Sequence, residues 1–311
     1  MHIFVTGGLG FIGSNFIRDL LLESKDIFIT NIDAETYAGN PDNLKDLQGK
    51  KNYQYFKGKI QDSNFIKDVL KRFNPDAIIN FAAETHVDRS IQSASPFVDT
   101  NIIGTHILLE AALKQKTKRY IQISTDEVYG SIEPPDKFTE NTPMDPSSPY
   151  SASKAGADHL VMAYHKTYGL NTSIIRCSNN FGPYQFPEKV IPYFISLALE
   201  NKNVPVYGDG LNIRDWIYVS DFCQAITLVL DKGKSGEIYN VGGDCEIANI
   251  DLTKIVLEKL KKPESLIKFV EDRLGHDRRY AMDSSKIEKE LGWKRKHSFN
   301  EALDKTIEWY K

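Results

Sequence analysis

A glycine-rich run close to the start of the chain most constrains its fold. The run Gly7-Gly8-Leu9-Gly10-Phe11-Ile12-Gly13 directly follows a short apolar pattern typical of a strand and opens a segment with helical periodicity. Glycine permits a tight turn and lets a ligand or a neighbouring helix approach the backbone closely. The free N–H groups at the start of a helix attract an anion such as a phosphate. The sequence therefore predicts a strand, a glycine-rich turn and a phosphate-binding helix, in that order.

Short runs rich in β-branched and aromatic residues alternate with segments of helical periodicity through the first half of the chain. The predicted strands are His2–Thr6, Ile27–Ile32, Tyr53–Phe56, Ala77–Ala82, Tyr120–Ser124 and Thr172–Cys177. Strands that alternate with helices are typical of a parallel sheet covered on both faces. The predicted fold class is therefore α/β, with a Rossmann-type doubly wound parallel sheet.

An aspartate follows the glycine run at the spacing of a dinucleotide-binding site. Asp33 ends the second strand pattern, twenty residues beyond Gly13. A carboxylate there accepts hydrogen bonds from a ribose diol and repels a 2′-phosphate, which favours NAD over NADP. We therefore predict NAD as the cofactor, with Gly7, Gly10 and Gly13 beside its pyrophosphate.

Composition narrows the class of partner. The 39 lysines and arginines nearly balance the 42 aspartates and glutamates, so a formal charge of -3 gives no reason to expect a nucleic acid or an anionic membrane, and a small ligand is favoured. Cys177, Cys223 and Cys245 have spacings that fit neither a zinc site nor a disulfide framework. No apolar run approaches the length of a membrane span, and the first residues do not read as a targeting segment. We expect a cytoplasmic protein without a catalytic metal.

A tyrosine and a lysine mark a candidate redox site. Tyr150 and Lys154 lie one turn apart in a predicted helix that ends at Gly169, so their side chains project from the same face. We expect the ammonium group to lower the pKa of the phenol. The tyrosine could then accept a proton from a sugar hydroxyl while hydride leaves the carbon.

Two adjacent carboxyl groups indicate a second kind of chemistry. Thr125, Asp126 and Glu127 follow a predicted strand. A plain reductase or an epimerase needs a hydroxyl here but no acid and base beside it. Elimination of water next to a ketone needs both, because one group removes a carbon-bound proton and the other protonates the departing hydroxyl. The pattern favours dehydration coupled to internal redox.

Six stretches, in order along nearly the whole chain, resemble the dTDP-glucose 4,6-dehydratases of the extended short-chain dehydrogenase/reductase superfamily. They are Ala83–Ser90, Thr125–Glu127, Tyr150–Lys154, Ser178–Tyr184, Arg214–Trp216 and Asp272–Tyr280. The resemblance implies conversion of dTDP-glucose to dTDP-4-keto-6-deoxyglucose and water, with NAD regenerated in each cycle. It also implies a place in deoxysugar synthesis of the dTDP-rhamnose type.

The same resemblance implies a role for each catalytic residue. Tyr150 takes the proton of the C4 hydroxyl, and Lys154 supports it and the nicotinamide ribose. Thr125 holds the sugar. Glu127 removes the C5 proton, and Asp126 protonates the C6 hydroxyl, which departs as water.

Further residues are implied to bind the two ligands. Around NAD, in addition to the three glycines, Tyr150 and Lys154, they are Phe11, Ile12, Asp33, Ile60, Asp62, Ala82, Ala83 and Thr100. Around the nucleotide-sugar, in addition to Thr125, they are Thr85, Asn180, Lys189, Tyr207, Arg214, Asn249, Arg273 and His276. Lysine and arginine suit a diphosphate because they supply positive charge, and arginine can bind it with two hydrogen bonds.

Prolines and glycines interrupt the alternating pattern after Cys177. We predict that residues 1–177 form an NAD-binding Rossmann domain that carries the catalytic residues, with its sheet completed by about 215–245. Residues 178–311 would mainly bind the nucleotide-sugar. The helical segments Ile102–Leu113 and Ala155–Tyr168 carry more apolar surface than one sheet face requires, and relatives pair such helices into a four-helix bundle. A homodimer is therefore expected.

Other activities remain open from the residues alone. The nearest are a 4,6-dehydratase acting on a UDP, CDP or GDP sugar and a UDP-hexose 4-epimerase. The Asp126-Glu127 pair argues against the epimerase, whereas charge and spacing do not reveal which base is bound. A non-catalytic dinucleotide-binding regulator is a further alternative, and the presence of every expected catalytic residue argues against it.

Overall fold

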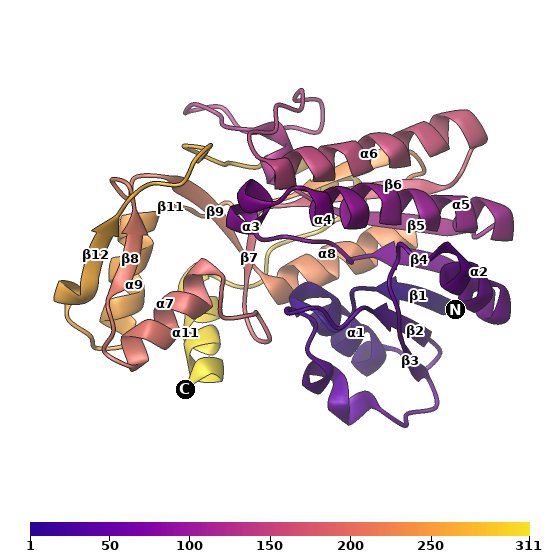
Figure 1. Ribbon diagram of the computed structural model, residues 1–311, viewed down its shortest axis with the longest axis horizontal. Helices are drawn as coiled ribbons and strands as arrows, with labels where there is room; N and C mark the ends of the chain where they lie inside the picture. Colours follow the sequence, from indigo (N-terminus) through magenta and orange to yellow (C-terminus); the bar gives the residue numbers. More distant parts are fainter.

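A seven-stranded parallel sheet forms the centre of the computed structural model, which describes residues 1–311 (Figure 1). Its order is β10-β6-β5-β4-β1-β2-β3, and every neighbouring pair is parallel. The strands are β1 (His2–Thr6), β2 (Phe28–Asp33), β3 (Tyr53–Lys57), β4 (Ala77–Asn80), β5 (Arg119–Thr125), β6 (Thr172–Cys177) and β10 (Glu237–Val241). The six predicted strands are present, although β4 ends at Asn80 rather than Ala82.

Helices cover both faces of this sheet (Figure 1). On one face α1 (Phe11–Glu23) packs against α8 (Val219–Lys232). On the other, α5 (Thr105–Gln115) packs between α2 (Ser63–Phe73) and α6 (Pro149–Tyr168). This arrangement confirms the predicted doubly wound α/β fold.

Side-chain alternation along the strands builds two separate cores. In β1, Phe4 belongs to the cluster under α2, α5 and α6, whereas Val5 belongs to the cluster under α1 and α8. Ile78 and Ile79 of β4 divide in the same way. All four side chains are fully buried. Strands buried on both faces read as continuous apolar runs, which explains why they were recognisable in the sequence.

Local signals at both ends of α6 fix the helix that carries Tyr150. Ser148 and Ser151 form a capping box at its start, with Pro149 at the first helical position. The helix ends at Gly169, which has a left-handed φ of 68°. A capped start and a glycine stop define the helix register and so the face on which Tyr150 lies.

The second half of the chain adds smaller elements beside the carboxyl ends of the large sheet (Figure 1). Three strands, β7 (Asn179–Phe181), β9 (Ile213–Tyr218) and β11 (Glu246–Ala248), form one sheet, and β8 (Val204–Tyr207) pairs with β12 (Ile267–Val270). Their core also includes residues from α7 (Val190–Leu199), α9 (Asn249–Lys259) and α11 (Phe299–Tyr310). Shorter helices are η1 (Pro41–Leu47), α3 (Val87–Gln92), α4 (Ser95–Phe97), η2 (Val98–Gly104), η3 (Asp126–Tyr129), η4 (Glu264–Leu266) and α10 (Ser285–Leu291).

The strand order places a ligand crevice between β1 and β4. The chain runs outward from β1 to β2 and β3, and then returns to β4 on the opposite side of β1. Ligands of open α/β sheets bind beyond the carboxyl ends of the strands at such a reversal. None of the helices has the length and apolar character required of a membrane span.

Candidate active site

A cavity of about 890 Å³ lies between the large sheet and the smaller elements of the second half. It is lined by every site residue predicted from the sequence except Asp62. On the cofactor side these are Gly7, Gly10, Phe11, Ile12, Gly13, Asp33, Ile60, Ala82, Ala83 and Thr100. The remaining ones are Thr85, Thr125, Asp126, Glu127, Tyr150, Lys154, Asn180, Lys189, Tyr207, Arg214, Asn249, Arg273 and His276.

The glycine-rich turn forms a cradle with no room for side chains. Gly7 has a φ of 71°, and a Cβ atom on it would lie 2.6 Å from the backbone nitrogen of Ala82. A Cβ on Gly13 would lie 2.5 Å from the carbonyl oxygen of Gly7. Helix α1 begins after Gly10 without a side-chain cap, so its first N–H groups remain available to an anion. These features fit the pyrophosphate of NAD.

Replacement of Gly13 by alanine is expected to reduce bound NAD by at least about tenfold, because the new methyl group would collide with rigid backbone and distort the cradle. The amount of NAD released from purified, heat-denatured protein measures this loss. Gly156→Ala is a matched control, because its Cβ would meet only the end of the Ile102 side chain, at 3.1 Å. NAD content equal to that of the wild type in Gly13→Ala would contradict the proposed role of the cradle.

The two predicted cofactor aspartates have different surroundings. Asp33 lines the cavity, where its Oδ2 accepts the Leu9 N–H at 3.0 Å and its Oδ1 accepts the Glu35 N–H at 2.8 Å. Burial raises the pKa of Asp33. Asp62 lies outside the cavity lining, and its carboxylate instead caps α2 by accepting the N–H groups of residues 64 and 65. Asp62 therefore caps a helix through Oδ1, and its contact with NAD stays a prediction.

The predicted catalytic carboxyl groups lie at the junction of β5 and η3. Thr125 is the last residue of β5, and Asp126 and Glu127 are the first residues of η3. The Thr125 hydroxyl donates a hydrogen bond to Asp126 Oδ1 at 3.2 Å and accepts the N–H of Glu127 at 3.2 Å. Asp126 is 2 % exposed, and its Oδ2 has no hydrogen-bond partner. The threonine thus fixes the backbone that presents both carboxyl groups to the cavity.

The surroundings of the two carboxyl groups differ in a way that suits an acid and a base. Burial raises the pKa of Asp126 well above its ordinary value, and the charges of Glu127 and Asp215 raise it further. Burial also raises the pKa of Glu127, but the cations of Lys189 and Arg214 oppose this rise. Asp126 therefore retains its proton more readily, whereas Glu127 loses its proton first.

Tyr150 and Lys154 both line the cavity, but their relation differs from the one expected. Burial and the Glu127 carboxylate raise the pKa of Tyr150 well above its ordinary value. Lys154 Nζ donates to the carbonyl oxygen of Ile123 at 2.7 Å, and desolvation lowers its pKa. The expectation that the protein itself lowers the pKa of Tyr150 was therefore wrong, because burial and the neighbouring Glu127 anion raise it.

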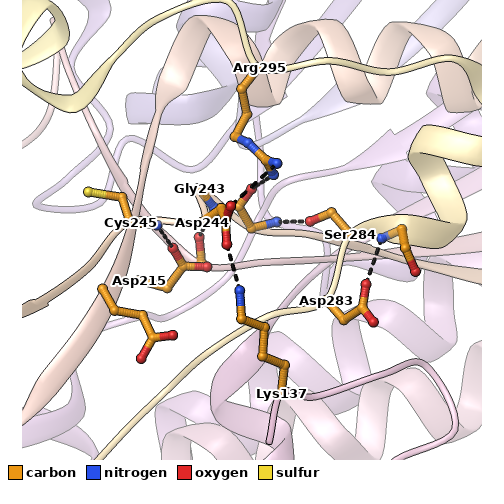
Figure 2. A network of polar contacts seen from close by, with 12 residues as sticks. Lys137, Asp215, Gly243, Asp244, Cys245, Asp283, Ser284 and Arg295 are labelled. Atoms are coloured by element: carbon orange, nitrogen blue, oxygen red, sulfur yellow. Dashed lines mark hydrogen bonds and ion pairs between the residues drawn. The ribbon is translucent and has the colours of Figure 1, made fainter. Parts of the chain in front are cut away.

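A polar network joins Asp215 to the loop that contains Asp244 (Figure 2). Asp215 of β9 is 1 % exposed, and its Oδ1 accepts the N–H of Cys245 at 2.8 Å. In the same loop, Asp244 pairs with Lys137 at 2.5 Å and lies 3.9 Å from Arg295. The network anchors residues 242–246 to β9. Arg214, which precedes Asp215 in β9, lines the cavity.

Asp215 should make stability depend on pH. Burial raises its pKa from 3.8 to about 6, so between these values the folded chain holds a proton that the unfolded chain releases. The contribution of Asp215 to the free energy of unfolding therefore falls as pH rises through this window and does not change further above it. Asp215→Asn removes the titration and retains an acceptor for Cys245.

Urea unfolding near pH 4.5 and about pH 7.5 tests this expectation. The wild type should lose about 2 kcal/mol more than Asp215→Asn over that interval, since one pKa unit corresponds to about 1.4 kcal/mol. Parallel loss of stability in both proteins would show that Asp215 does not titrate as its burial indicates.

The cationic residues of the cavity are held by backbone and aromatic groups. Lys189 Nζ donates to the carbonyl oxygen of Thr85 at 2.9 Å. Arg214 Nη2 donates to the carbonyl oxygen of Asp277 at 2.9 Å, and its guanidinium lies 4.2 Å from the ring centre of Tyr280. These contacts hold positive charge at fixed positions in the cavity without neutralising it.

The neutral residues predicted to bind substrate also line this part of the cavity. The buried amide oxygens of Asn180 and Asn249 have no partner in the protein. His276 Nδ1 lies 2.7 Å from Asp272 Oδ1, and its ring packs edge-on against Tyr207, with the ring centres 6.3 Å apart. Unpaired buried polar atoms are costly, so these amides are suited to a polar ligand.

The cavity lining also includes residues that the sequence did not single out, among them Asp88, Glu188 and Trp216. Glu188 Oε2 lies 3.7 Å from His86 Nε2, and Trp216 Nε1 is buried without a partner. Asp88 and Trp216 belong to stretches that carried the family resemblance, which was the only available signal. Glu188 precedes Lys189, and no spacing distinguished it from a surface acid.

The profile of the GDP-mannose 4,6 dehydratase family matches residues 4–306. A dTDP-glucose 4,6-dehydratase of Xanthomonas campestris pv. campestris (strain B100) is 48% identical over 98% of this chain and 92% of its own length. The low-salt glycan biosynthesis protein Agl12 of Haloferax volcanii is 51% identical over 100% of this chain and 98% of its own length.

Similarity in structure is equally extensive. DesIV, a dTDP-glucose 4,6-dehydratase from Streptomyces venezuelae solved with NAD bound, superimposes with a TM-score of 0.97 at 46% identity, covering 100% of this chain and 97% of that chain. The chain therefore belongs to the GDP-mannose 4,6-dehydratase family, and within it is similar along its whole length to the dTDP-glucose 4,6-dehydratases.

Proposed function

We propose that this protein is an NAD-dependent dTDP-glucose 4,6-dehydratase, a hydro-lyase that forms dTDP-4-keto-6-deoxyglucose and water. The observation that carries the proposal is the pair Asp126 and Glu127, which share one cavity with Thr125 and Tyr150. Burial raises the pKa of both carboxyl groups, but the carboxylates of Glu127 and Asp215 favour the protonated form of Asp126, whereas the cations of Lys189 and Arg214 favour the charged form of Glu127. One cavity thus contains a tyrosine for the oxidation step (Tyr150), a general acid (Asp126) and a general base (Glu127).

The cofactor site is formed by residues of the large sheet. The glycine cradle and the start of α1 hold the pyrophosphate, and Asp33 faces the adenosine ribose. When bound, NAD⁺ supplies a hydride acceptor for C4, and its reduced form returns hydride to C6. Lys154, with its amine held by the Ile123 carbonyl, supports the nicotinamide ribose.

The residues of the chain divide the proton transfers. Tyr150 accepts the proton of the C4 hydroxyl as C4 is oxidised. Because burial and the Glu127 carboxylate raise the pKa of Tyr150 in the protein alone, this role requires that the positive charge of bound NAD⁺ favours the phenolate. Thr125 holds the resulting keto oxygen. Glu127 then takes the proton from C5, whose acidity the adjacent ketone increases. Asp126 gives its proton to the C6 hydroxyl, so that the C6–O bond breaks with loss of water. A proton returns to C5 as hydride is added to C6, which completes the 4-keto-6-deoxy product.

The second half of the chain holds the nucleotide-sugar. Lys189, Arg214 and Arg273 supply the charge that a diphosphate needs. The remaining contacts are made by Thr85, Asn180, Tyr207, Asn249 and His276. In this proposal, residues 1–177 together with β10 bind NAD and carry the catalytic groups. Residues 178–311 mainly bind the substrate.

Turnover of dTDP-glucose tests the assignment most simply. The purified protein should convert dTDP-glucose to a product with the alkali-induced absorbance of a keto-deoxy sugar. UDP-glucose, supplied at the same concentration, should react far more slowly. Turnover of UDP-glucose without turnover of dTDP-glucose would instead support a dehydratase for another nucleotide. A 4-epimerised sugar as the sole product would support the epimerase, which has no use for Asp126 and Glu127 as an acid and base.

We further propose a homodimer formed through the face that carries α5 and α6. Val98, Ile103 and Tyr168 are 42%, 44% and 55% exposed, which leaves large apolar side chains uncovered on η2 and α6. Light scattering at micromolar concentration should give twice the mass of one chain, and a monomeric mass would contradict the proposal.

The three unpaired cysteines fit a reducing compartment, so we place the reaction in the cytoplasm. The product would enter deoxysugar synthesis of the dTDP-rhamnose type.

A further inference from the structure

The segment from the end of β4 into the first turn of α3 contacts two cations from the second half of the chain. Its Thr85 carbonyl oxygen accepts a hydrogen bond from Lys189, and Asp88 in the first turn of α3 forms an ion pair with Arg273. Both cations line the cavity, and both bind the substrate diphosphate in the proposed function. One short segment of the sheet domain thus holds two of the proposed diphosphate-binding side chains across the cleft.

The Asp88–Arg273 pair combines one hydrogen bond with a second close contact. Arg273 Nη2 donates a hydrogen bond to Asp88 Oδ2 at 3.0 Å. Arg273 Nε lies 2.6 Å from Asp88 Oδ1, but its N–H is not aligned for a hydrogen bond, so this second contact is an ion contact only. The side chains are only 24% and 32% exposed, so the pair is shielded more than a surface ion pair. The two contacts together hold the guanidinium beside the carboxylate.

The ring of Tyr207 makes a second contact with the same guanidinium group. The Arg273 Cζ atom lies 5.3 Å from the ring centre of Tyr207, within the range of a cation–π interaction. Arg273 Nη1 makes no hydrogen bond to the protein. Nη2 is bonded to Asp88, Nε is buried against the same carboxylate, and the guanidinium lies near the Tyr207 ring, so Nη1 is the nitrogen left for a ligand.

We propose that Asp88 is a positioning residue for diphosphate recognition, because it orients Arg273 so that one nitrogen stays available to the substrate. The inference rests on the proposed function, in which Arg273 contacts the diphosphate. Asp88 does not touch the reacting carbons in this role. It joins α3 to the loop 271–280 and thereby keeps that wall of the cleft at a fixed distance from the sheet.

The expected effect separates binding from chemistry. Asp88→Asn retains the size of the side chain but loses the charge that holds Arg273. In the NAD-loaded enzyme, KM for dTDP-glucose should rise about tenfold, whereas kcat should change less than about threefold, because the catalytic groups are untouched. Asp88→Glu keeps the carboxylate and should restore part of the loss.

A matched control comes from the same loop. Asp209 forms an ion pair with Arg278 at 2.9 and 3.1 Å, but this pair is exposed and neither residue lines the cavity. Asp209→Asn should leave KM and kcat unchanged. An increase in KM equal to that of Asp88→Asn would mean that any ion pair on the loop has this effect, and the positioning role of Asp88 would be rejected.

A double-mutant cycle tests whether Asp88 acts through Arg273. Dissociation constants of dTDP and of UDP are measured by calorimetry for the NAD-loaded wild type, Asp88→Asn, Arg273→Ala and the double variant. If the inference holds, Asp88→Asn weakens dTDP binding in the wild type but adds nothing once Arg273 is absent. Equal weakening in both backgrounds, or none in either, would overturn it.

The same design separates this inference from the proposed function. Failure of the wild type to convert dTDP-glucose would reject the function and leave the binding cycle intact, because a diphosphate ligand reports on Arg273 whichever base is preferred. If the wild type converts dTDP-glucose but the effects of Asp88→Asn and Arg273→Ala on dTDP binding are additive, only the inference is rejected.

Discussion

Replacement of Glu127 by glutamine is expected to stop water loss while leaving sugar oxidation detectable. The amide cannot take the C5 proton, so formation of the keto-deoxy product should fall by about 10²- to 10⁴-fold, the usual range for a general base. Tyr150 and the residues of the cofactor site are retained in this variant, and loss of the Glu127 charge favours ionisation of Tyr150. Reduced cofactor should therefore accumulate after dTDP-glucose is added and be visible as NADH absorbance.

A partly buried carboxylate outside the cavity provides the control. Glu140 accepts the N–H of Asn240 at 2.9 Å and does not line the site. Glu140→Gln should turn over like the wild type. Undiminished product formation by Glu127→Gln would remove Glu127 from its role as base, and loss of both oxidation and dehydration would place it at an earlier step.

Replacement of Tyr150 by phenylalanine should block the first step instead of the second. Without the phenol, no group in the proposed mechanism accepts the C4 hydroxyl proton, so both NADH appearance and product formation should fall by about 10²- to 10⁴-fold. The NAD content of the protein should be preserved, because the glycine cradle is untouched. Rapid mixing with dTDP-glucose, followed by absorbance, measures the oxidation step directly.

Tyr129→Phe is the control for this change. Tyr129 is buried close by in the sequence, but its hydroxyl donates to Asn240 Oδ1 at 2.8 Å and does not line the cavity. Turnover within about threefold of the wild type is expected, since the lost hydroxyl only supports structure. NADH formation at the wild-type rate in Tyr150→Phe would show that another group accepts the proton.

Local patterns were sufficient for the first half of the fold. Its strands are buried on both faces and so read as short apolar runs, and its helices start and stop at recognisable residues such as Ser148 and Gly169. The boundary of β4 was less certain, because Phe81 and Ala82 continue the apolar run beyond the last paired residue, Asn80.

The second half was not predictable in the same detail. Its short strands pair with distant segments, as Glu246 of β11 does with Asp215 of β9, and β10 joins the large sheet beside β6. Such pairings depend on tertiary packing and leave no periodic signal in three to six residues.

The candidate site shows the same division. The acid, the base and the tyrosine were visible because they lie close together in the sequence, in patterns that resemble one family. The Asp88–Arg273 pair joins residues that are 185 positions apart, and only the fold brings them together. The raised pKa of Tyr150 was missed because burial and the nearby Glu127 carboxylate decide it, rather than Lys154 alone.

Isotope transfer within one sugar tests the central claim most directly. The account requires that hydride removed from C4 return to C6 of the same molecule after water has left. With dTDP-glucose deuterated at C4, NMR of the product should show a 4-keto-6-deoxy sugar with deuterium in its C6 methyl group. Deuterium back at C4 of a 4-epimerised hexose, or a keto-deoxy product without deuterium at C6, would contradict the account.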